Sequence, residues 1–196
     1  MSSKPSHFFA YISRLRLIQR WGLMYNVHPE NVQEHSVQVS FIAHMLAVIK
    51  NRIFGGEVDP ARTALLAMYH DTSEVITGDL PTPIKYFSPQ IKKAYKEIEQ
   101  VANVRLFQFL PDELKGEFTS IFFSQEDDRD HWALVKAADK ISAYLKCVEE
   151  LKAGNQEFAK AGEVLHKTIE ELSMPEVKYF MEVFLPSMEL TLDELE

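Results

Sequence analysis

The feature that most constrains this chain is a short apolar segment that ends in a group of ionisable side chains. Five apolar residues occupy positions 64–68, and His70, Asp71 and Glu74 follow them. The apolar run predicts a buried helix, in which residues three and four apart share a face, so that Glu74 lies over both other side chains. Buried imidazole and carboxylate groups are costly unless something pairs with them. A divalent metal ion satisfies both kinds of group and is the most economical partner.

A His-Asp pair alone is weak support for a metal site, because such pairs occur by chance in many proteins. His35 lies in the apolar stripe of a second predicted helix, and Asp139 lies in a third, within Ala137–Lys140. A lone inward histidine is more often a hydrogen-bonded core residue than a ligand. Three helices that each direct a metal-competent side chain to the core reverse that preference and favour a metal site.

The rest of the chain has the pattern of an all-α protein, a compact helical bundle with one domain over residues 1–196. Apolar residues recur at helical spacing, and no segment is a convincing strand. We expect a first helix over Ser6–Arg20 and a second from Asn31, which can cap it with Glu34. A third helix is expected to begin at Asp59–Pro60 and to continue through the ionisable group to Gly78.

A proline-containing segment, Gly78–Lys85, follows the ionisable group directly. Its two prolines, Pro81 and Pro83, predict a stiff loop without regular helix or strand. A rigid loop beside a site is suited to hold a ligand, and an ordinary connector is an equally good interpretation of these residues. A later helix over Asp130–Ala153 carries Asp139.

Composition argues against several classes of protein. The net charge of −8 argues against an extended nucleic-acid interface, which needs a basic face. The single cysteine, Cys147, excludes an internal disulfide and fits a reducing compartment. The N-terminus lacks the apolar core of a signal peptide, and no run approaches the ~20 apolar residues of a membrane span. We therefore expect neither a nucleic-acid polymer nor a membrane as partner.

The four candidate ligands are two imidazoles and two carboxylates: His35, His70, Asp71 and Asp139. Mixed nitrogen and oxygen ligands suit one first-row divalent ion, such as manganese, iron, cobalt, nickel, copper or zinc. Magnesium is less suited, because it prefers oxygen ligands. Glu74 is not needed as a ligand, and its place one turn away suits proton transfer during the attack of a water molecule.

The pattern of His35, His70–Asp71 and Asp139 resembles the HD superfamily of metal-dependent phosphohydrolases. More closely, the chain resembles the bacterial HD-domain 5'-deoxynucleotidases of the YfbR type over nearly its full length. The matching segments include Glu34–His35–Ser36, and the Gly78–Pro83 loop together with Arg20–Trp21 is the more specific match.

The resemblance implies an enzyme that removes the 5'-phosphate from deoxyribonucleoside monophosphates and discriminates against ribonucleotides. It implies a cytoplasmic homodimer that favours cobalt, with Glu74 as the catalytic acid. The implied metal ligands are His35, His70, Asp71 and Asp139. The implied substrate-binding residues are Arg20, Trp21, His35, Asp71, Asp79, Leu80, Pro81, Thr82 and Asp139.

Physical chemistry agrees with the roles that the resemblance gives to three of these residues. A phosphate monoester is dianionic, and Arg20 offers fixed, forked donors that orient the phosphate as well as neutralise it. Trp21 would reject a ribose by filling the space of its 2'-hydroxyl. Asp79 would accept a hydrogen bond from the sugar 3'-hydroxyl. Without the resemblance, Arg20 is more simply a solvated charge and Trp21 a core anchor.

Three alternatives remain open at this point. One is another HD phosphohydrolase, which acts on deoxynucleoside triphosphates or cyclic nucleotides. The second is a non-catalytic binding module with a structural metal ion, although such a site has no need of an unliganded acid like Glu74. The third is a structural helical protein without a metal ion.

Overall fold

The computed structural model describes residues 5–85, 87–123 and 125–195. These residues form α-helices and short 3₁₀ helices and contain no strand, although Gln19 and Asn31 form an isolated antiparallel bridge. The all-α class is therefore confirmed. Contacts divide the chain into two compact units, and each is described below by itself. The prediction of a single domain over 1–196 stays a prediction.

The first unit contains the described residues of Met1–Leu23, Pro29–Ser36 and Tyr69–Glu126. Its elements are α1 (Phe8–Ile12), the 3₁₀ helix η1 (Leu15–Leu17), α4 (Glu74–Thr77), α5 (Thr82–Lys85), α6 (Pro89–Gln108) and α7 (Asp112–Phe122). The second unit contains the described residues of Met24–His28, Val37–Met68 and Asp127–Glu196. Its elements are α3 (Pro60–Tyr69, of which Tyr69 belongs to the first unit), α8 (Arg129–Lys152), η3 (Gln156–Phe158), α9 (Ala159–Glu170), α10 (Pro175–Val183), η4 (Leu185–Glu189) and η5 (Leu192–Glu194).

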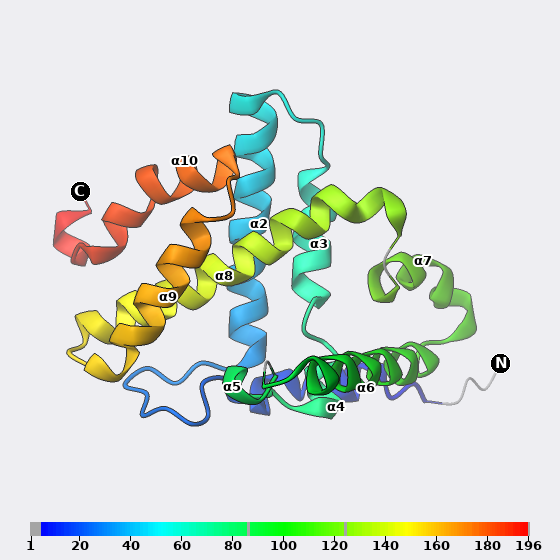
Figure 1. The fold of residues 1–196 in the computed structure, drawn as a ribbon. Coiled ribbons are helices and arrows are strands. Elements are labelled where there is room, and N and C mark those ends of the chain that lie inside the picture. Colours follow the sequence, from blue (N-terminus) through cyan, green and yellow to red (C-terminus); the bar gives the residue numbers. More distant parts are fainter. Residues whose placement is uncertain (1–4, 86, 124, 196) are drawn as a thin grey trace. The chain divides into compact units, whose positions relative to one another are not determined.

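Besides α3, whose last residue Tyr69 belongs to the first unit, two further elements are shared between the units. Helix α2 (Val32–Phe54) runs as one continuous helix, with its residues up to Ser36 in the first unit and the others in the second (Figure 1). The short 3₁₀ helix η2 (Glu126–Asp128) contains the boundary between Glu126 and Asp127. A side chain near the start of α2 therefore belongs with the first unit, and the rest of the helix belongs with the second.

Aromatic side chains form the core of the first unit. Phe8 of α1 packs edge-on against Phe118 and Phe122 of α7, with ring centroids 5.5 and 6.0 Å apart. Leu106 and Leu110 complete the buried cluster. Edge-to-face pairs of this kind stabilise a core by about 0.5–1.5 kcal/mol beyond the area that they bury. This packing fixes the N-terminal segment that leads to Arg20.

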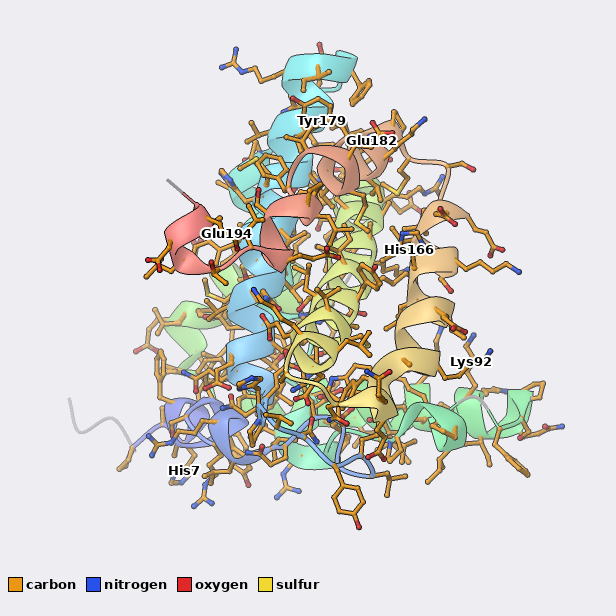
Figure 2. The ribbon with its side chains drawn as sticks, turned by 90° about the vertical axis from the view of Figure 1, so that its left-hand side faces the viewer. His7, Lys92, His166, Tyr179, Glu182 and Glu194 are labelled. Carbon is orange, nitrogen blue, oxygen red and sulfur yellow. The ribbon has the colours of Figure 1, made fainter. Side chains whose placement is uncertain are left out.

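The second unit has a cavity of about 630 Å³ beside α9 and α10. His166 of α9 and Glu182 of α10 contribute to its lining (Figure 2). Ionisable groups in the lining lie close to one another. His166 lies 3.8 Å from Glu170, and Lys178 lies 3.7 Å from Glu182. The cavity lies within the second unit, and among the described residues its lining contains no group of three ligands that could hold a metal ion.

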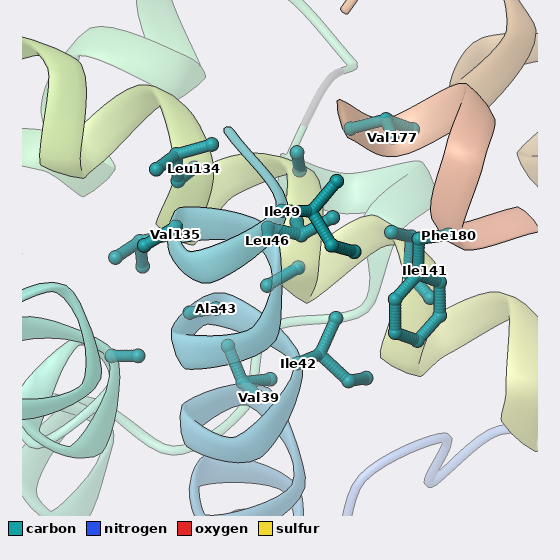
Figure 3. Close-up of a cluster of buried hydrophobic side chains, with 14 of the residues drawn as sticks. Val39, Ile42, Ala43, Leu46, Ile49, Leu134, Val135, Ile141, Val177 and Phe180 are labelled. Carbon is teal, nitrogen blue, oxygen red and sulfur yellow. The ribbon is translucent and has the colours of Figure 1, made fainter. Parts of the chain in front are cut away.

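The core of the second unit is aliphatic and centres on α2. Val39, Leu46 and Ile49 are buried against residues of α8 and α10, among them Ile141 and Phe180 (Figure 3). Burial of a side chain of this size contributes about 1.5–3 kcal/mol. The helical stripe that predicted an inward face for α2 is therefore confirmed over its whole length.

Helix α2 is long enough and apolar enough to cross a membrane, as judged by length and composition alone. The mean hydropathy over an 18-residue window is 1.2, so the expectation that no segment approaches such a length was too strict. Core helices pass the same test, and α2 supplies six buried side chains to the core of the second unit.

The prediction of one helix over Ser6–Arg20 is wrong beyond its first turns. Helix α1 ends at Ile12, η1 follows, and the backbone becomes extended at Ile18. The physical reason is a long-range pairing, because the Ile18 carbonyl accepts a hydrogen bond from the N–H of Val32 at 3.0 Å. The extended conformation lets the chain after Ile18 pair with the residues that precede α2.

The proline-containing loop is also more regular than predicted, because its second half forms the short helix α5. The Pro81 carbonyl accepts hydrogen bonds from the N–H groups of Ile84 and Lys85, at 2.8 and 3.0 Å. Pro83 lies at the second position of this helix, where an N–H has no intrahelical partner, so proline is tolerated. The expectation that the prolines exclude regular helix from 78–85 is corrected accordingly.

Candidate metal centre

His70 and Asp71 lie on a turn, which corrects the expectation of one continuous helix. Helix α3 ends at Tyr69, and the chain turns through bonds from Thr72 N–H to the Tyr69 carbonyl (3.2 Å) and from Glu74 N–H to the Asp71 carbonyl (3.0 Å). The Thr72 hydroxyl donates to the same Tyr69 carbonyl at 2.8 Å. Threonine hydroxyls that bind nearby carbonyls favour turns and helix ends over helix interiors. Helix α4 then begins at Glu74.

His35 lies in the first turn of α2, and its side chain is fully buried. The start of the helix is capped as predicted. The Asn31 side-chain oxygen accepts hydrogen bonds from the N–H groups of Gln33 and Glu34, at 3.1 and 3.0 Å. The cap fixes the first turn, and the prediction that His35 faces inward is confirmed.

The structure brings three of the four predicted ligands together. His70 Nε2 lies 3.0 Å from Asp71 Oδ2, and His35 Nε2 lies 3.6 Å from the same oxygen. The two imidazole centroids are 5.4 Å apart. One ligand atom from each of the three residues lies within 4.8 Å of the other two. Residues from two separate helix ends thus converge on one point.

This donor set fits a single divalent ion. Atoms bound to one ion at about 2.1 Å lie roughly 3.0–3.4 Å apart in octahedral or tetrahedral coordination. The two imidazole distances to Asp71 Oδ2, 3.0 and 3.6 Å, are close to that range. Two imidazoles and one carboxylate would hold the ion and leave positions for further ligands.

Asp71 is kept in its charged form by its neighbours. Burial alone would raise its pKa, but His70, which also hydrogen-bonds to the carboxylate, His35 and Arg20 together lower the pKa of Asp71 well below its usual range. Positive or hydrogen-donating groups stabilise a carboxylate in this way. The carboxylate is therefore available as a metal ligand over the whole neutral range.

Arg20 lies beside this group and is held by a residue that sequence reasoning missed. Its Nε donates to Glu30 Oε2 at 3.0 Å, and its Nη1 lies 3.7 Å from Asp71 Oδ2. Glu30 Oε1 in turn lies 3.9 Å from His35 Nδ1. The only sequence signal for Glu30 was its position immediately before the capping residue of α2, which does not reveal its partners.

Trp21 and Asp79 are connected through the backbone. Trp21 adopts a positive φ of 57°, which is an unusual conformation for a bulky residue. The backbone N–H of Trp21 donates a hydrogen bond to the Asp79 carboxylate. Burial and the nearby Asp71 raise the pKa of Asp79, whereas Arg20, Lys85 and the Trp21 hydrogen bond oppose that rise. Asp79 therefore stabilises the strained backbone beside Arg20.

Glu74 is buried, with 5% of its surface exposed. Its Oε2 has no hydrogen-bond partner within the part of the chain that the structure describes. Burial, followed by the charges of Asp71 and Asp79, raises the pKa of Glu74 to about 9, although Arg20 and Lys85 act in the opposite direction. A carboxyl group with these properties holds a proton at neutral pH in the metal-free protein.

The loop after Glu74 is anchored on α6. The Tyr95 hydroxyl donates to the Gly78 carbonyl at 3.2 Å, and Gly78 has a positive φ of 73° that favours glycine. Lys85 contacts Glu99 at 3.1 Å, and its Nζ lies 4.8 Å from the centre of the Tyr95 ring. Burial would lower the pKa of Lys85, but Glu99 raises it further, so this lysine remains a cation near Glu74 and Asp79.

The remaining predicted site residues fall in two places. Leu80 and Pro81 are half-buried in the anchored loop. The backbone of Thr82 begins α5, and its side chain lies outside the described part of the structure. Asp139 is half-buried on α8 in the second unit, between the buried Ala138 and Lys140. Its role as the fourth ligand stays a prediction.

Comparisons with known proteins agree with the chemistry of this group. The family described as "5'-deoxynucleotidase YfbR-like" matches residues 7–188. A 5'-deoxynucleotidase of Vibrio cholerae serotype O1 is 58% identical over 192 residues, which are 98% of this chain and 99% of that protein.

Solved structures with the same fold include HD-domain proteins. A Listeria innocua HD-domain phosphohydrolase has a TM-score of 0.81 and 25% identity, over 93% of this chain and 88% of that one. A cyanophage S-2L HD phosphohydrolase bound to dA and one catalytic Zn²⁺ ion has a TM-score of 0.67 over 93% and 96%, with 20% identity. The second likeness shows the fold alone. From its sequence and fold, the chain belongs to the YfbR-like family of 5'-deoxynucleotidases.

Proposed function

We propose that this protein is a metal-dependent phosphomonoesterase, which hydrolyses deoxyribonucleoside 5'-monophosphates to deoxyribonucleosides and phosphate. The observation that carries the proposal is the convergence of His35, His70 and Asp71 beside the buried acid Glu74. The V. cholerae relative carries the name of this activity, and the cyanophage neighbour binds a deoxynucleoside and a metal ion.

We propose one divalent ion, with cobalt favoured by the resemblance and with manganese, iron, nickel, copper and zinc as alternatives. Asp139 would be the fourth ligand, and helix register supports this role. Gln38, one turn after His35 on α2, accepts a 2.6 Å hydrogen bond from Ser142, which lies one turn after Asp139 on α8. Residues three apart on a helix share a face.

When bound, the ion would lower the pKa of a water ligand and stabilise negative charge on the phosphoryl oxygens. Arg20 would bind the phosphate with its forked donors and orient it for in-line attack. Its Nη1 already points toward the metal group, since it lies 3.7 Å from Asp71 Oδ2.

Glu74 would move a proton during hydrolysis. A water oxygen attacks phosphorus and gives up a proton, the bond from phosphorus to the 5'-oxygen breaks, and the leaving 5'-oxygen gains a proton. Glu74 is suited to this exchange, because its pKa of about 9 keeps it protonated until a nearby cation lowers that value.

Selection of the sugar would depend on Trp21 and on the anchored loop after Gly78. Trp21 would fill the space of a 2'-hydroxyl, and its position is stabilised by the hydrogen bond from its N–H to Asp79. Because Asp79 is half-buried, we propose that it also accepts a hydrogen bond from the sugar 3'-hydroxyl. Leu80, Pro81 and Thr82 would contact the rest of the nucleoside.

The test is phosphate release from dAMP and AMP, each measured with added cobalt and with excess chelator. We expect rapid release from dAMP, slower release from AMP, and loss of both with the chelator. Release that is unchanged by the chelator, or that is equal for the two substrates, would contradict the proposal. Triphosphate or pyrophosphate release from dATP would instead favour another HD phosphohydrolase.

We further propose a cytoplasmic homodimer, as the resemblance implies. An exposed apolar stripe on α2, formed by Val37, Phe41 and Met45, is compatible with an interface between copies. Light scattering after gel filtration measures the mass in solution, and a monomeric mass would contradict the dimer.

A further inference from the structure

We propose that Glu30 is a positioning residue, which uses one carboxylate to hold the Arg20 guanidinium and to bias the His35 imidazole. This inference rests on the proposed function, in which Arg20 binds the phosphate and His35 binds the metal ion. In that function Glu30 would contact neither the phosphate nor the metal ion, and it would act through Arg20 and His35.

A short antiparallel pairing of the backbone places Glu30 opposite Arg20. The Arg20 N–H donates to the Glu30 carbonyl at 2.9 Å, and the Val32 N–H donates to the Ile18 carbonyl at 3.0 Å. Glu30 lies in the segment immediately before α2, whose first turn carries His35. The backbone thus brings the phosphate-binding side chain and a metal ligand to the two sides of one carboxylate.

Each oxygen of that carboxylate faces a different partner. Oε2 accepts a hydrogen bond from Arg20 Nε at 3.0 Å, and Oε1 lies 3.9 Å from His35 Nδ1. The side chains of Arg20 and Glu30 are both only 12% exposed, so little solvent screens their ion pair. Because Glu30 binds the Nε edge, the Nη1 group of Arg20 is directed toward Asp71.

The contact with His35 is longer than a hydrogen bond and acts through charge. A carboxylate on the Nδ1 side favours the tautomer that carries its proton on Nδ1, which leaves Nε2 available for a metal ion. His35 Nε2 is the atom that lies 3.6 Å from Asp71 Oδ2, in the candidate metal group. We expect this contribution to be smaller than that of the direct hydrogen bond to Arg20.

If Glu30 acted only through its charge, its removal would have the opposite effect on phosphate binding from the one expected of a positioning residue. Glu30 places a negative charge near a site that binds an anion, so its removal would strengthen phosphate binding if the carboxylate acted only through the field. If Glu30 positions Arg20, its removal weakens phosphate binding, because the guanidinium loses its fixed orientation. The sign of the change therefore distinguishes the two roles.

The experiment measures the affinity of the cobalt-loaded protein for inorganic phosphate by calorimetry, together with kcat and KM on dAMP. For Glu30→Gln we expect a loss of roughly 10–100-fold in phosphate affinity and in kcat/KM, as for residues that support metal sites. The matched control is Glu34→Gln, an exposed glutamate four residues away that accepts a hydrogen bond from the Asn31 N–H. It should change neither quantity by more than about twofold.

A double-mutant cycle with Arg20→Ala tests whether Glu30 acts through Arg20. We expect Glu30→Gln to cause little further loss of phosphate affinity when Arg20 is already absent. Additive losses, or tighter phosphate binding by Glu30→Gln, would overturn the inference. Wild type that binds phosphate but does not hydrolyse dAMP would overturn the proposed function, while the order of phosphate affinities still decides the role of Glu30. Wild type that binds no phosphate would overturn both.

Discussion

Among the buried glutamates, Glu74 of the first unit and Glu150 of the second have opposite environments. Glu150 of α8 is fully buried, and four donors bind its carboxylate. Its Oε1 accepts from Lys146 and from the His28 N–H at 2.9 Å, and its Oε2 accepts from the Val27 N–H at 2.9 Å and from Asn155 at 2.7 Å. Burial alone would raise the pKa of Glu150, but these donors lower it to about 2.

Glu74 in the first unit has the contrasting arrangement. It is also buried, its Oε2 has no partner among the described residues, and its pKa is raised to about 9. The same type of side chain is thus a carboxylate anion at Glu150 and a protonated carboxyl group at Glu74. Donor groups decide between these states, because burial disfavours the charged form at both sites.

The contrast indicates different purposes. A carboxylate with every oxygen satisfied joins segments of the fold, and Glu150 attaches the segment 27–28 to α8. A buried acid without such donors costs stability and is retained where a reaction needs it. We therefore expect the loss of Glu74 to change activity and the loss of Glu150 to change stability.

The largest expected effect is on the activity of Glu74→Gln. Glutamine keeps the shape of the side chain but cannot exchange a proton, so kcat on dAMP should fall about 10²–10⁴-fold. Bound cobalt, measured by elemental analysis, should remain at the wild-type level, and the free energy of unfolding should not fall. Loss of the metal ion would instead identify Glu74 as a ligand. Exposed Glu97 on α6, changed to Gln, is the control and should behave as wild type.

The next effect is on the stability of Glu150→Gln. The substitution leaves the Lys146 ammonium buried without its carboxylate, and breaking a buried pair in this way costs about 3–5 kcal/mol. Unfolding in urea measures the loss, and kcat per folded molecule should stay near that of wild type. A loss below about 1 kcal/mol, the value of an exposed pair, would show that the network is solvated and would remove the contrast with Glu74.

Sequence reasoning identified three residues of the candidate metal group because their signal is local. An apolar run that ends in His70 and Asp71, and an inward His35, are visible from spacing alone, and the structure brings the three together. The turn that carries His70 and Asp71 was not visible, because it depends on competition for one carbonyl at the end of α3. Helical periodicity cannot report such a choice.

Glu30 and Glu150 were missed for a related reason. Lys146 and Glu150 are four residues apart, which is the spacing of an ordinary exposed pair on a helix. Residues 27–28, more than 100 residues away in the chain, pack against the pair and donate two further hydrogen bonds to the Glu150 carboxylate. Glu30 likewise acquires its partner Arg20 through backbone pairing that crosses a loop. Long-range contacts of this kind leave no periodic signal in the sequence.

The last prediction is a difference in how the two glutamates link stability to pH in the metal-free protein. The pKa of Glu150 is lowered from 4.5 to about 2, so its contribution is complete above pH 4.5 and is lost as the pH falls toward 2. The pKa of Glu74 is raised from 4.5 to about 9, so the folded state binds an extra proton between these values. Stability from Glu74 is therefore complete below pH 4.5 and falls as the pH rises toward 9.

The measurement is the free energy of unfolding in urea from pH 3 to pH 9, with chelator present, for wild type and both glutamine variants. Relative to wild type, Glu74→Gln should flatten the curve above pH 4.5, because it removes the group that loses its proton there. Glu150→Gln should flatten the curve below pH 4.5, because no carboxylate remains to be protonated. If the Glu74 variant keeps the wild-type slope above pH 4.5, Glu74 is ionised at neutral pH. The two buried glutamates would then differ in their partners but not in their charge, and proton transfer from Glu74 would lose its physical basis.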